Sequence, residues 1–258
     1  MKKIPLNQAL AVAVKAARAA GRVMQDNWLK PKRVKLDDAH DIKLELDVRC
    51  QHLIEKILRA AFPEIPLLGE EGDSGDVTAE YRWVVDPIDG TVNYFYGMPH
   101  AAVSIALQHR GKSVVGVIYG PFTDEIWTTV RGGPTRLNGK IVRVSNRSKL
   151  EDAVIAMGFS KNRENMERSL PHLNRLARRV KKIRVMGSAA LELVYVASGR
   201  LDAYIERTIN LWDVAAGQLL VENAGGEFYV LPAPHGKLRM CASNGKLRKK
   251  LQIDSLLK

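Results

Sequence analysis

The chain has 258 residues, of which 46% are hydrophobic and 26% charged, a composition typical of a globular protein with a large core. No apolar run approaches the roughly 20 residues that span a bilayer, and the two cysteines have no metal-binding spacing. These features argue against a membrane protein, a disulfide framework and a zinc site, and they favour a cytoplasmic protein. The net charge of +12 is regional, because segments 161–184 and 237–258 hold nine and seven Lys or Arg against two and one acidic residues.

Helical periodicity and β-rich runs predict the elements of the chain in order. The expected helices cover Leu6–Trp28, Asp47–Phe62, Asn165–Val180, Ser188–Ser198 and Val214–Ala224. The expected strands cover Arg82–Val85, Ala102–Leu107, Val114–Tyr119, Glu125–Val130, Val154–Met157, Arg184–Met186, Asp202–Ile205 and Glu227–Val230. The first apolar stretch is interrupted by Lys15 and Arg18 at helical spacing, so we favour an amphipathic helix there over a signal peptide.

The order of these elements predicts an α/β protein built from two halves. Residues 1–147 run through helices and then consecutive strands, which indicates an antiparallel sheet covered by helices. Residues 148–258 alternate strand and helix, which indicates a smaller, more parallel sheet. We place the boundary near Ser145–Leu150 and expect the active site where the halves meet.

The helix expected over Asn165–Val180 carries part of the excess positive charge. Arg168, Arg175, Arg179 and Lys182 recur at helical spacing and are expected to form a stripe along one face. Such a stripe keeps a protein soluble, steers anionic substrates or binds nucleic acid. We favour a solvated face, and nucleic-acid binding stays open.

The segment Trp83-Val-Val-Asp86-Pro-Ile-Asp89-Gly90-Thr91 carries two closely spaced carboxylates. We expect a strand to end at Asp86, because Pro87 has no N–H to donate to a sheet. Two carboxylates held this close repel each other unless a cation lies between them, and Mg²⁺ prefers oxygen ligands. A simple strand-ending turn is the alternative, since Asp, Pro and Gly are common in turns.

Two further acidic groups strengthen the case for a metal site. Glu70 and Glu71 follow an apolar run, and Asp213 precedes the small-residue helix that begins at Val214. Taken alone, the glutamates suit a solvated loop and Asp213 suits a helix N-cap. The combination of all three groups is what indicates metal chemistry.

These motifs resemble those of the inositol monophosphatase family in order and spacing. The resemblance rests on Gly69-Glu70-Glu71, Asp86-Pro-Ile-Asp89-Gly90-Thr91 and Trp212-Asp213-Val-Ala-Ala-Gly217, supported by Leu137-Asn138-Gly139, Val185-Met-Gly-Ser-Ala-Ala190, Ala224-Gly-Gly226 and Ala242-Ser-Asn244. It implies a layered αβαβα sandwich of the sugar-phosphatase type, with an antiparallel N-terminal sheet and a smaller mixed C-terminal sheet. It also implies two or three Mg²⁺ ions, a homodimer and inhibition by lithium.

The resemblance further implies roles for individual residues. Those implied to hold the metals are Glu70, Asp86, the Ile88 carbonyl, Asp89 and Asp213, with Asp86 bridging two ions. Backbone N–H groups of Gly90 and Thr91 would bind phosphate at a helix start. Thr91 and Asp47 would orient and deprotonate the attacking water, and Glu70 would hold a further, weaker ion.

On the substrate side the resemblance implies contacts from Asp89, Asp213, Gly187, Ser188, Ala189 and Glu206. Glu206 would accept hydrogen bonds from polyol hydroxyls, although a surface charge is the plain alternative, and Arg207 could pair with it or reach a second anionic group. The chain departs from the family before Asp47. Lys43 and Glu45 add charges beside the expected active-site loop, which runs from about Pro31 to His40.

The resulting hypothesis is Mg²⁺-dependent hydrolysis of a small phosphate monoester, with myo-inositol 1-phosphate as the expected substrate. Fructose 1,6-bisphosphate, histidinol phosphate and 3′-phosphoadenosine 5′-phosphate stay open as alternatives. A regulatory RNA- or protein-binding role with incidental phosphatase activity belongs to a different class and also stays open.

Overall fold

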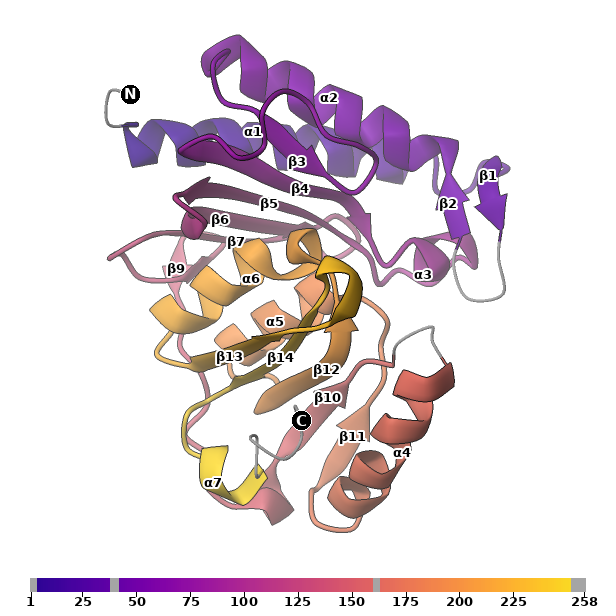
Figure 1. Cartoon of the computed structure of the whole chain (residues 1–258), viewed down its shortest axis with the longest axis vertical. Coiled ribbons are helices and arrows are strands. Elements are labelled where there is room, and N and C mark those ends of the chain that lie inside the picture. The colour runs from indigo at the N-terminus through magenta and orange to yellow at the C-terminus, as the bar shows by residue number, and fades with distance from the viewer. Residues whose placement is uncertain (1–3, 38–41, 160–162, 252–258) are drawn as a thin grey trace.

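The chain folds into five alternating layers of helix and sheet (Figure 1), and the computed structural model describes residues 4–37, 42–159 and 163–251. Helices α1 (Leu6–Asp26) and α2 (Glu45–Ala61) cover the outer face of a seven-stranded sheet. Helices α5 (Ala189–Ala197) and α6 (Leu211–Asn223) separate this sheet from a five-stranded one. Helices α4 (Arg163–Ala177) and α7 (Arg248–Leu251) lie beyond the smaller sheet. The predicted αβαβα arrangement is confirmed.

The larger sheet follows the chain from one edge to the other. Its strands, in spatial order, are β3 (Leu67–Gly69), β4 (Tyr81–Asp89), β5 (Ala102–His109), β6 (Lys112–Gly120), β7 (Glu125–Val130), β8 (Arg136–Leu137) and β9 (Lys140–Ile141). The pair β3–β4 is parallel and the other pairs are antiparallel. The one-turn helix α3 (Thr91–Phe95) follows β4 directly.

A separate antiparallel pair is formed by β1 (Val34–Asp37) and β2 (Ile42–Leu44), and β1 lies within the region, about Pro31 to His40, where the sequence suggests a loop. The end of that predicted loop, residues 38–40, lies outside the described residues. Strand β2 runs directly into α2.

The smaller sheet is mixed, as predicted. In spatial order its strands are β11 (Lys182–Arg184), β10 (Val154–Met157), β12 (Ala203–Ile209), β14 (Leu238–Ser243) and β13 (Glu227–Pro232). Strand β10 pairs in parallel with β11 and β12, whereas β14 is antiparallel to both of its neighbours. Short 3₁₀ turns occupy Leu150–Asp152 and Pro234–Gly236. Strand β14 is not expected from the sequence, because Leu-Arg-Met-Cys-Ala-Ser contains no β-branched or aromatic residue.

Side-chain size on the larger sheet sets the position of α6. Large apolar residues of β5 face α1 and α2, whereas Ala102 and Ala106 face the inner helices. On the neighbouring strand, a Cβ at Gly116 would lie 3.0 Å from the carbonyl oxygen of Ala216. The small residues therefore let the backbone of α6 pack directly on the sheet, which brings the start of α6 beside the end of β4.

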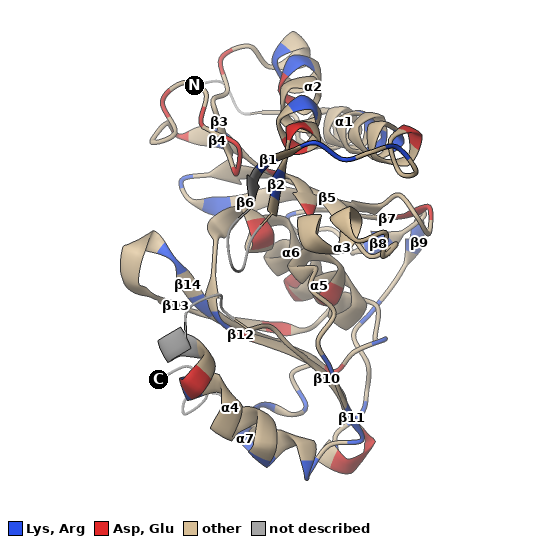
Figure 2. Ribbon diagram, turned by 90° about the vertical axis from the view of Figure 1, so that its right-hand side faces the viewer, with Lys and Arg blue, Asp and Glu red and all other residues tan. Residues whose placement is uncertain are grey.

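The predicted basic stripe does not form. Helix α4 ends at Ala177, so Arg179 follows the helix and Lys182 belongs to β11. Figure 2 shows Lys and Arg spread over several elements, among them α2, β1 and β14. The stripe was predicted on a helix that extended to Val180, whereas the helix ends at Ala177. Among the described residues, no helix is both long enough and apolar enough to cross a bilayer.

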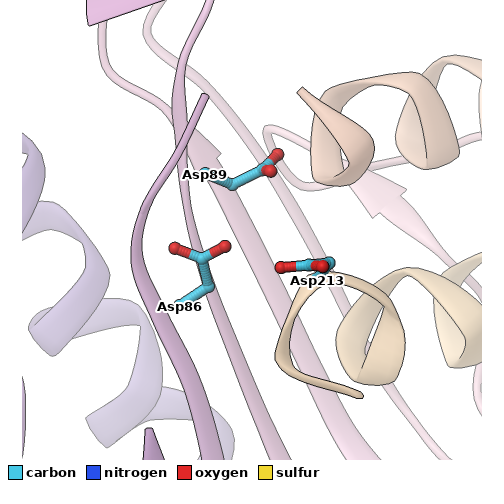
Figure 3. Close-up of side chains that lie close together, drawn as sticks. All are labelled: Asp86, Asp89 and Asp213. Carbon is cyan, nitrogen blue, oxygen red and sulfur yellow. The ribbon is translucent and has the colours of Figure 1, made fainter. Parts of the chain in front are cut away.

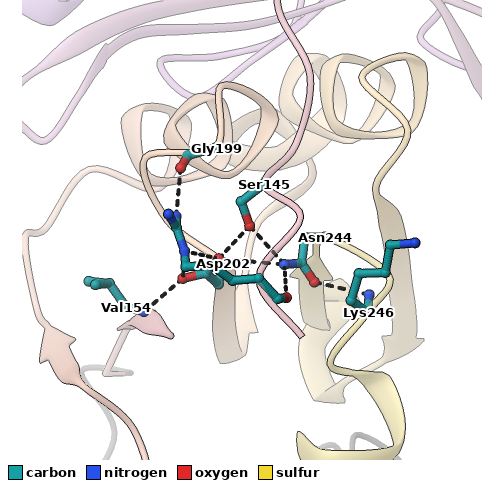
Figure 4. A network of polar contacts seen from close by, with 7 residues as sticks. Ser145, Val154, Gly199, Asp202, Asn244 and Lys246 are labelled. Atoms are coloured by element: carbon teal, nitrogen blue, oxygen red, sulfur yellow. Dashed lines mark hydrogen bonds and ion pairs between the residues drawn. The ribbon is translucent and has the colours of Figure 1, made fainter. Parts of the chain in front are cut away.

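A buried carboxylate fastens the segment between the two sheets (Figure 4). The single Nε–H of Arg147 is shared between the two carboxylate oxygens of Asp202, at 2.8 and 2.9 Å, and the backbone N–H of Val154 donates to Asp202 at 2.8 Å. The hydroxyl of Ser145 donates to the same carboxylate at 2.5 Å, and Asn244 bonds to Ser145 at 2.8 Å. One fully buried side chain thus joins the connecting segment, β10 and the end of β14.

Replacing Asp202 with Ala should destabilise the protein by about 3 kcal/mol, because several buried donors lose their acceptor together. For a chain of this size the expected fall in Tm is roughly 10 °C. Glu151→Ala is the matched control, since its ion pair with Lys149 is largely exposed and contributes little. Equal Tm values for the two variants in differential scanning calorimetry would contradict this role.

Candidate active site

Three aspartates from two elements converge between the sheets (Figure 3). Asp86 and Asp89 lie at the end of β4 and Asp213 lies in the first turn of α6. Each offers a carboxylate oxygen, and the three oxygens lie within 4.8 Å of one another. The structure therefore brings together three of the predicted metal ligands.

An irregularity in β4 places both of its carboxylates on one side. The strand continues to Asp89 instead of ending at Asp86, and its register shifts between these two residues. Pro87 lies in this irregular stretch, where no sheet hydrogen bond requires its missing N–H. In a regular strand, residues three apart would face opposite sides of the sheet. The predicted end of the strand was wrong because a shift in register can accommodate a proline.

Asp213 is held by the start of its own helix. Its Oδ2 accepts a hydrogen bond from the backbone N–H of Asn210 at 2.9 Å. It is therefore the third helical residue of a capping box and not the N-cap itself. The helix dipole favours a negative charge at this position.

Glu70 joins the cluster from the neighbouring strand. The parallel pairing of β3 and β4 puts Gly69 opposite Val85, so Glu70 emerges beside Asp86 and their carboxyl groups lie within hydrogen-bonding range. Gln51 of α2 supports this turn by accepting from the N–H of Glu71 at 2.9 Å. Nothing in the sequence pattern indicates that role for Gln51.

Asp47 and Thr91 also come together as predicted. The Thr91 hydroxyl lies 3.0 Å from Asp47 Oδ1 and 2.8 Å from the Ile88 carbonyl oxygen. Asp47 Oδ2 accepts from the N–H of Leu44 at 3.0 Å, which fixes the buried carboxylate at the start of α2. Lys43, which departs from the family pattern, lies with its Nζ 3.3 Å from Glu71 Oε1 and therefore contributes positive charge beside the cluster.

Gly90 connects β4 to α3 in a backbone conformation that only glycine adopts easily. Its φ is +92°, and a Cβ there would lie 2.9 Å from the carbonyl oxygen of His100. A side chain at this position would therefore be strained and would crowd the turn at Gly187 and Ser188.

The turn before α5 contacts Asp89, one of the predicted metal ligands, directly. Ser188 Oγ donates to Asp89 Oδ2 at 2.5 Å, and the N–H of Ala190 donates to the same oxygen at 2.7 Å. Asn93 holds the turn from the other side, donating to the carbonyl oxygen of Met186 at 2.7 Å. Ser188 is buried, so its side chain positions Asp89. The sequence gives no hint of the role of Asn93.

These groups surround one cavity of about 830 Å³. Its lining includes four carboxylates of the cluster together with Gly187, Ala189 and Glu206. The remaining wall includes the basic residues Arg168, His235, Lys237 and Arg239. The cavity can therefore accept a polar, anionic molecule much larger than a phosphate ion.

Burial and mutual repulsion perturb the carboxyl groups. Burial, followed by the charges of Glu70, Asp89 and Asp213, holds the pKa of Asp86 well above its usual range. Burial likewise raises the pKa of Asp89 to about 6 and those of Glu70 and Asp47 to about 7. A divalent cation between the carboxylates would remove this penalty, and the all-oxygen donor set fits Mg²⁺.

Asp86→Asn should stabilise the metal-free protein, by an amount that depends on pH. When folding raises the pKa of a carboxyl group, the folded protein loses stability as the pH rises from the unfolded pKa of that group, about 4, toward its folded pKa. The Tm advantage of the variant in EDTA should therefore grow between about pH 5 and pH 8. A lower Tm than wild type at pH 7 in EDTA would show that repulsion at Asp86 is not significant.

Comparisons with known proteins show which family the chain resembles. The sequence profile of the inositol monophosphatase family matches residues 6–250. The chain is 42% identical over 223 residues to Nus factor SuhB of Xylella fastidiosa, covering 84% of this chain and 80% of that protein. It is 40% identical over 221 residues to inositol-1-monophosphatase of Rhizobium meliloti, covering 84% and 83%.

The fold also matches a solved relative. The crystal structure of extragenic suppressor protein suhB from Bartonella henselae superposes with a TM-score of 0.88 at 36% identity, covering 96% of this chain and 98% of that one. Sequence and fold agree along nearly the whole chain, and the chain therefore belongs to the inositol monophosphatase family.

Proposed function

We propose that the protein hydrolyses a small phosphate monoester with the help of Mg²⁺, using water as the nucleophile. The observation that supports this most strongly is the cluster of Asp86, Asp89 and Asp213 with Glu70 beside it. Four clustered carboxyl groups that face one cavity, two of them buried and two half-buried, have no structural use that would offset their repulsion. Binding of divalent cations gives them one.

The proposed ligands form two overlapping sets. Glu70, Asp86 and the Ile88 carbonyl would hold one ion, and Asp86, Asp89 and Asp213 would hold the other. Bound Mg²⁺ would polarise the phosphoryl group and stabilise the attacking and leaving oxygens. The backbone N–H groups of Gly90 and Thr91 would bind the phosphate oxygens at the start of α3.

Thr91 and Asp47 are the proposed activators of the water. The Thr91 hydroxyl has one proton, which it donates either to Asp47 or to the Ile88 carbonyl, both of which lie within 3.0 Å. Its lone pairs remain available to a water molecule. A pKa near 7 suits Asp47 to take the proton that the water loses.

We further propose that the substrate carries a polyol, with myo-inositol 1-phosphate as the first choice. Glu206 lines the cavity and suits hydroxyl groups, which donate to a carboxylate. The similar inositol-1-monophosphatase of Rhizobium meliloti supports this choice. Arg168, Lys237 and Arg239 on the same wall favour testing fructose 1,6-bisphosphate and 3′-phosphoadenosine 5′-phosphate alongside it. From family resemblance we propose a cytoplasmic homodimer inhibited by lithium.

A second candidate, a regulatory role, is favoured by similarity to a protein named Nus factor SuhB and by the net charge of +12. The two functions can be separated in cells that lack the gene for this protein, by supplying either the active protein or an inactive variant and comparing growth. Rescue of growth by the active protein alone supports catalysis as the function. Rescue by Asp86→Asn as well supports regulation.

Phosphatase activity should require Mg²⁺ and should fall on the order of a thousand-fold in Asp86→Asn, because the bridging negative charge is lost. The measurement is release of inorganic phosphate with and without EDTA, with circular dichroism to confirm folding. Glu151→Gln removes an exposed carboxylate that does not line the cavity and should keep full activity. Undiminished hydrolysis in EDTA would rule out the proposed chemistry.

Glu206→Gln should raise KM for inositol 1-phosphate about ten-fold, since a hydrogen bond to a charged acceptor becomes a neutral one. The KM for p-nitrophenyl phosphate should change little, because that substrate has no polyol. Steady-state kinetics on both substrates measures the difference. Equal losses on the two would make Glu206 a structural residue.

A further inference from the structure

Two carboxyl groups in the cavity wall share one tyrosine hydroxyl. Glu192 of α5 and Tyr204 of β12 are both almost completely buried. The Tyr204 hydroxyl donates to Glu206 Oε2 and also lies within hydrogen-bonding range of the Glu192 carboxyl group. Glu192 and Glu206 line the cavity, but the proposed chemistry uses only Glu206.

The number of available protons determines which hydrogen bonds Glu192, Tyr204 and Glu206 can form with one another. A tyrosine hydroxyl has one proton, so Tyr204 cannot donate to both carboxyl groups at once, and while it donates to Glu206 its oxygen can only accept from Glu192. An ionised Glu192 would offer that oxygen only acceptors and would also face the charge of Glu206 across a buried space. A protonated Glu192 would donate to the oxygen and remove the repulsion.

The surroundings of Glu192 favour the neutral form. Glu192 Oε1 accepts from the backbone N–H of Met186 at 3.0 Å, as the carbonyl oxygen of a carboxylic acid can. Burial, followed by the charge of Glu206, raises the pKa of Glu192 well above its usual range. Glu206 is less buried and its carboxyl group lies over Gly158, so it is the better place for the negative charge.

We propose that Glu192 is a positioning residue that carries a proton and donates it in a hydrogen bond to Tyr204, which in turn fixes the Glu206 carboxylate for a substrate hydroxyl. The chain of donors runs from Glu192 through Tyr204 to Glu206 and leaves Glu206 with the charge. Only its last step rests on the proposed function, because that step assumes that Glu206 binds the polyol.

The same residue links the substrate side to the metal side. Through Met186, Glu192 holds the turn that carries Ser188 and Ala190, and both of these donate to Asp89. The buried Glu192 carboxyl group thus has two contacts. One is Met186, in the turn that holds the proposed metal ligand Asp89, and the other is the Tyr204 hydroxyl, which orients Glu206.

Three substitutions test the donor chain. Tyr204→Phe removes only the hydroxyl and should raise KM for inositol 1-phosphate about ten-fold while leaving KM for p-nitrophenyl phosphate unchanged. Glu192→Gln should retain nearly wild-type kinetics, since its amide can accept from Met186 and donate to Tyr204. Glu192→Ala should lose both contacts, and combining it with Tyr204→Phe should add no further rise in the polyol KM.

A purely structural Glu192 would give different results. Tyr204→Phe would then alter both substrates equally or neither, and Glu192→Gln would match Glu192→Ala if the carboxylate charge were what mattered. Either result overturns the proposal.

An infrared measurement tests the proton without any substrate. The difference spectrum between wild type and Glu192→Gln, at pH 7 with saturating Mg²⁺, should contain the C=O stretch of a protonated carboxyl group. Its absence overturns the proposal even if Glu206→Gln raises the polyol KM. Its presence together with an unaffected polyol KM in Glu206→Gln would leave the donor chain intact and refute the assignment of the polyol to Glu206.

Discussion

Repulsion among clustered, largely buried carboxylates is the constraint on which the centre of this structure depends. The oxygens of Asp86, Asp89 and Asp213 lie within 4.8 Å of one another, and Glu70 is beside them. Such a group is costly to bury while it is charged, as the raised pKa values show. The surrounding fold has to hold the carboxylates in place against this force.

Several rigid features share that task. The register shift in β4 turns two aspartates to one side, and the parallel pairing with β3 adds Glu70. The close packing of α6 on Gly116 brings in Asp213, and hydrogen bonds from Ser188 and Ala190 restrain Asp89. These supports come from the larger sheet and from the start of both helices that pack on its inner face, so the site exists only where these layers are assembled.

The sequence predicted the layers and the acidic cluster because both leave local marks. Periodicity identified the long helices and most strands, and the aspartates lie where a strand or a helix begins or ends. Strand β14 was missed because its residues have weak strand preferences, and the end of β4 was missed because proline normally ends pairing.

The supporting polar residues were not predictable, because their partners are distant in the chain. Gln51 contacts Glu71, and Asn93 contacts Met186, through hydrogen bonds that depend on the assembled fold. Glu192 did leave a signal, since it is the one charged residue in the apolar helix Ala189–Ala197. A lone acid in such a helix is expensive to bury unless it is neutral or paired, and this could have marked it as a candidate.

The most direct test of cation binding by this carboxylate cluster is to measure the protons that are released when Mg²⁺ binds. Carboxyl groups with raised pKa values are partly protonated near pH 6, and a divalent cation must displace those protons to bind. Isothermal titration of Mg²⁺ into the metal-free protein at pH 6, in buffers of different ionisation enthalpy, gives the number of protons released. Net release in the wild type, and less in Asp86→Asn, is the predicted result. Binding without release, or with proton uptake, would contradict it.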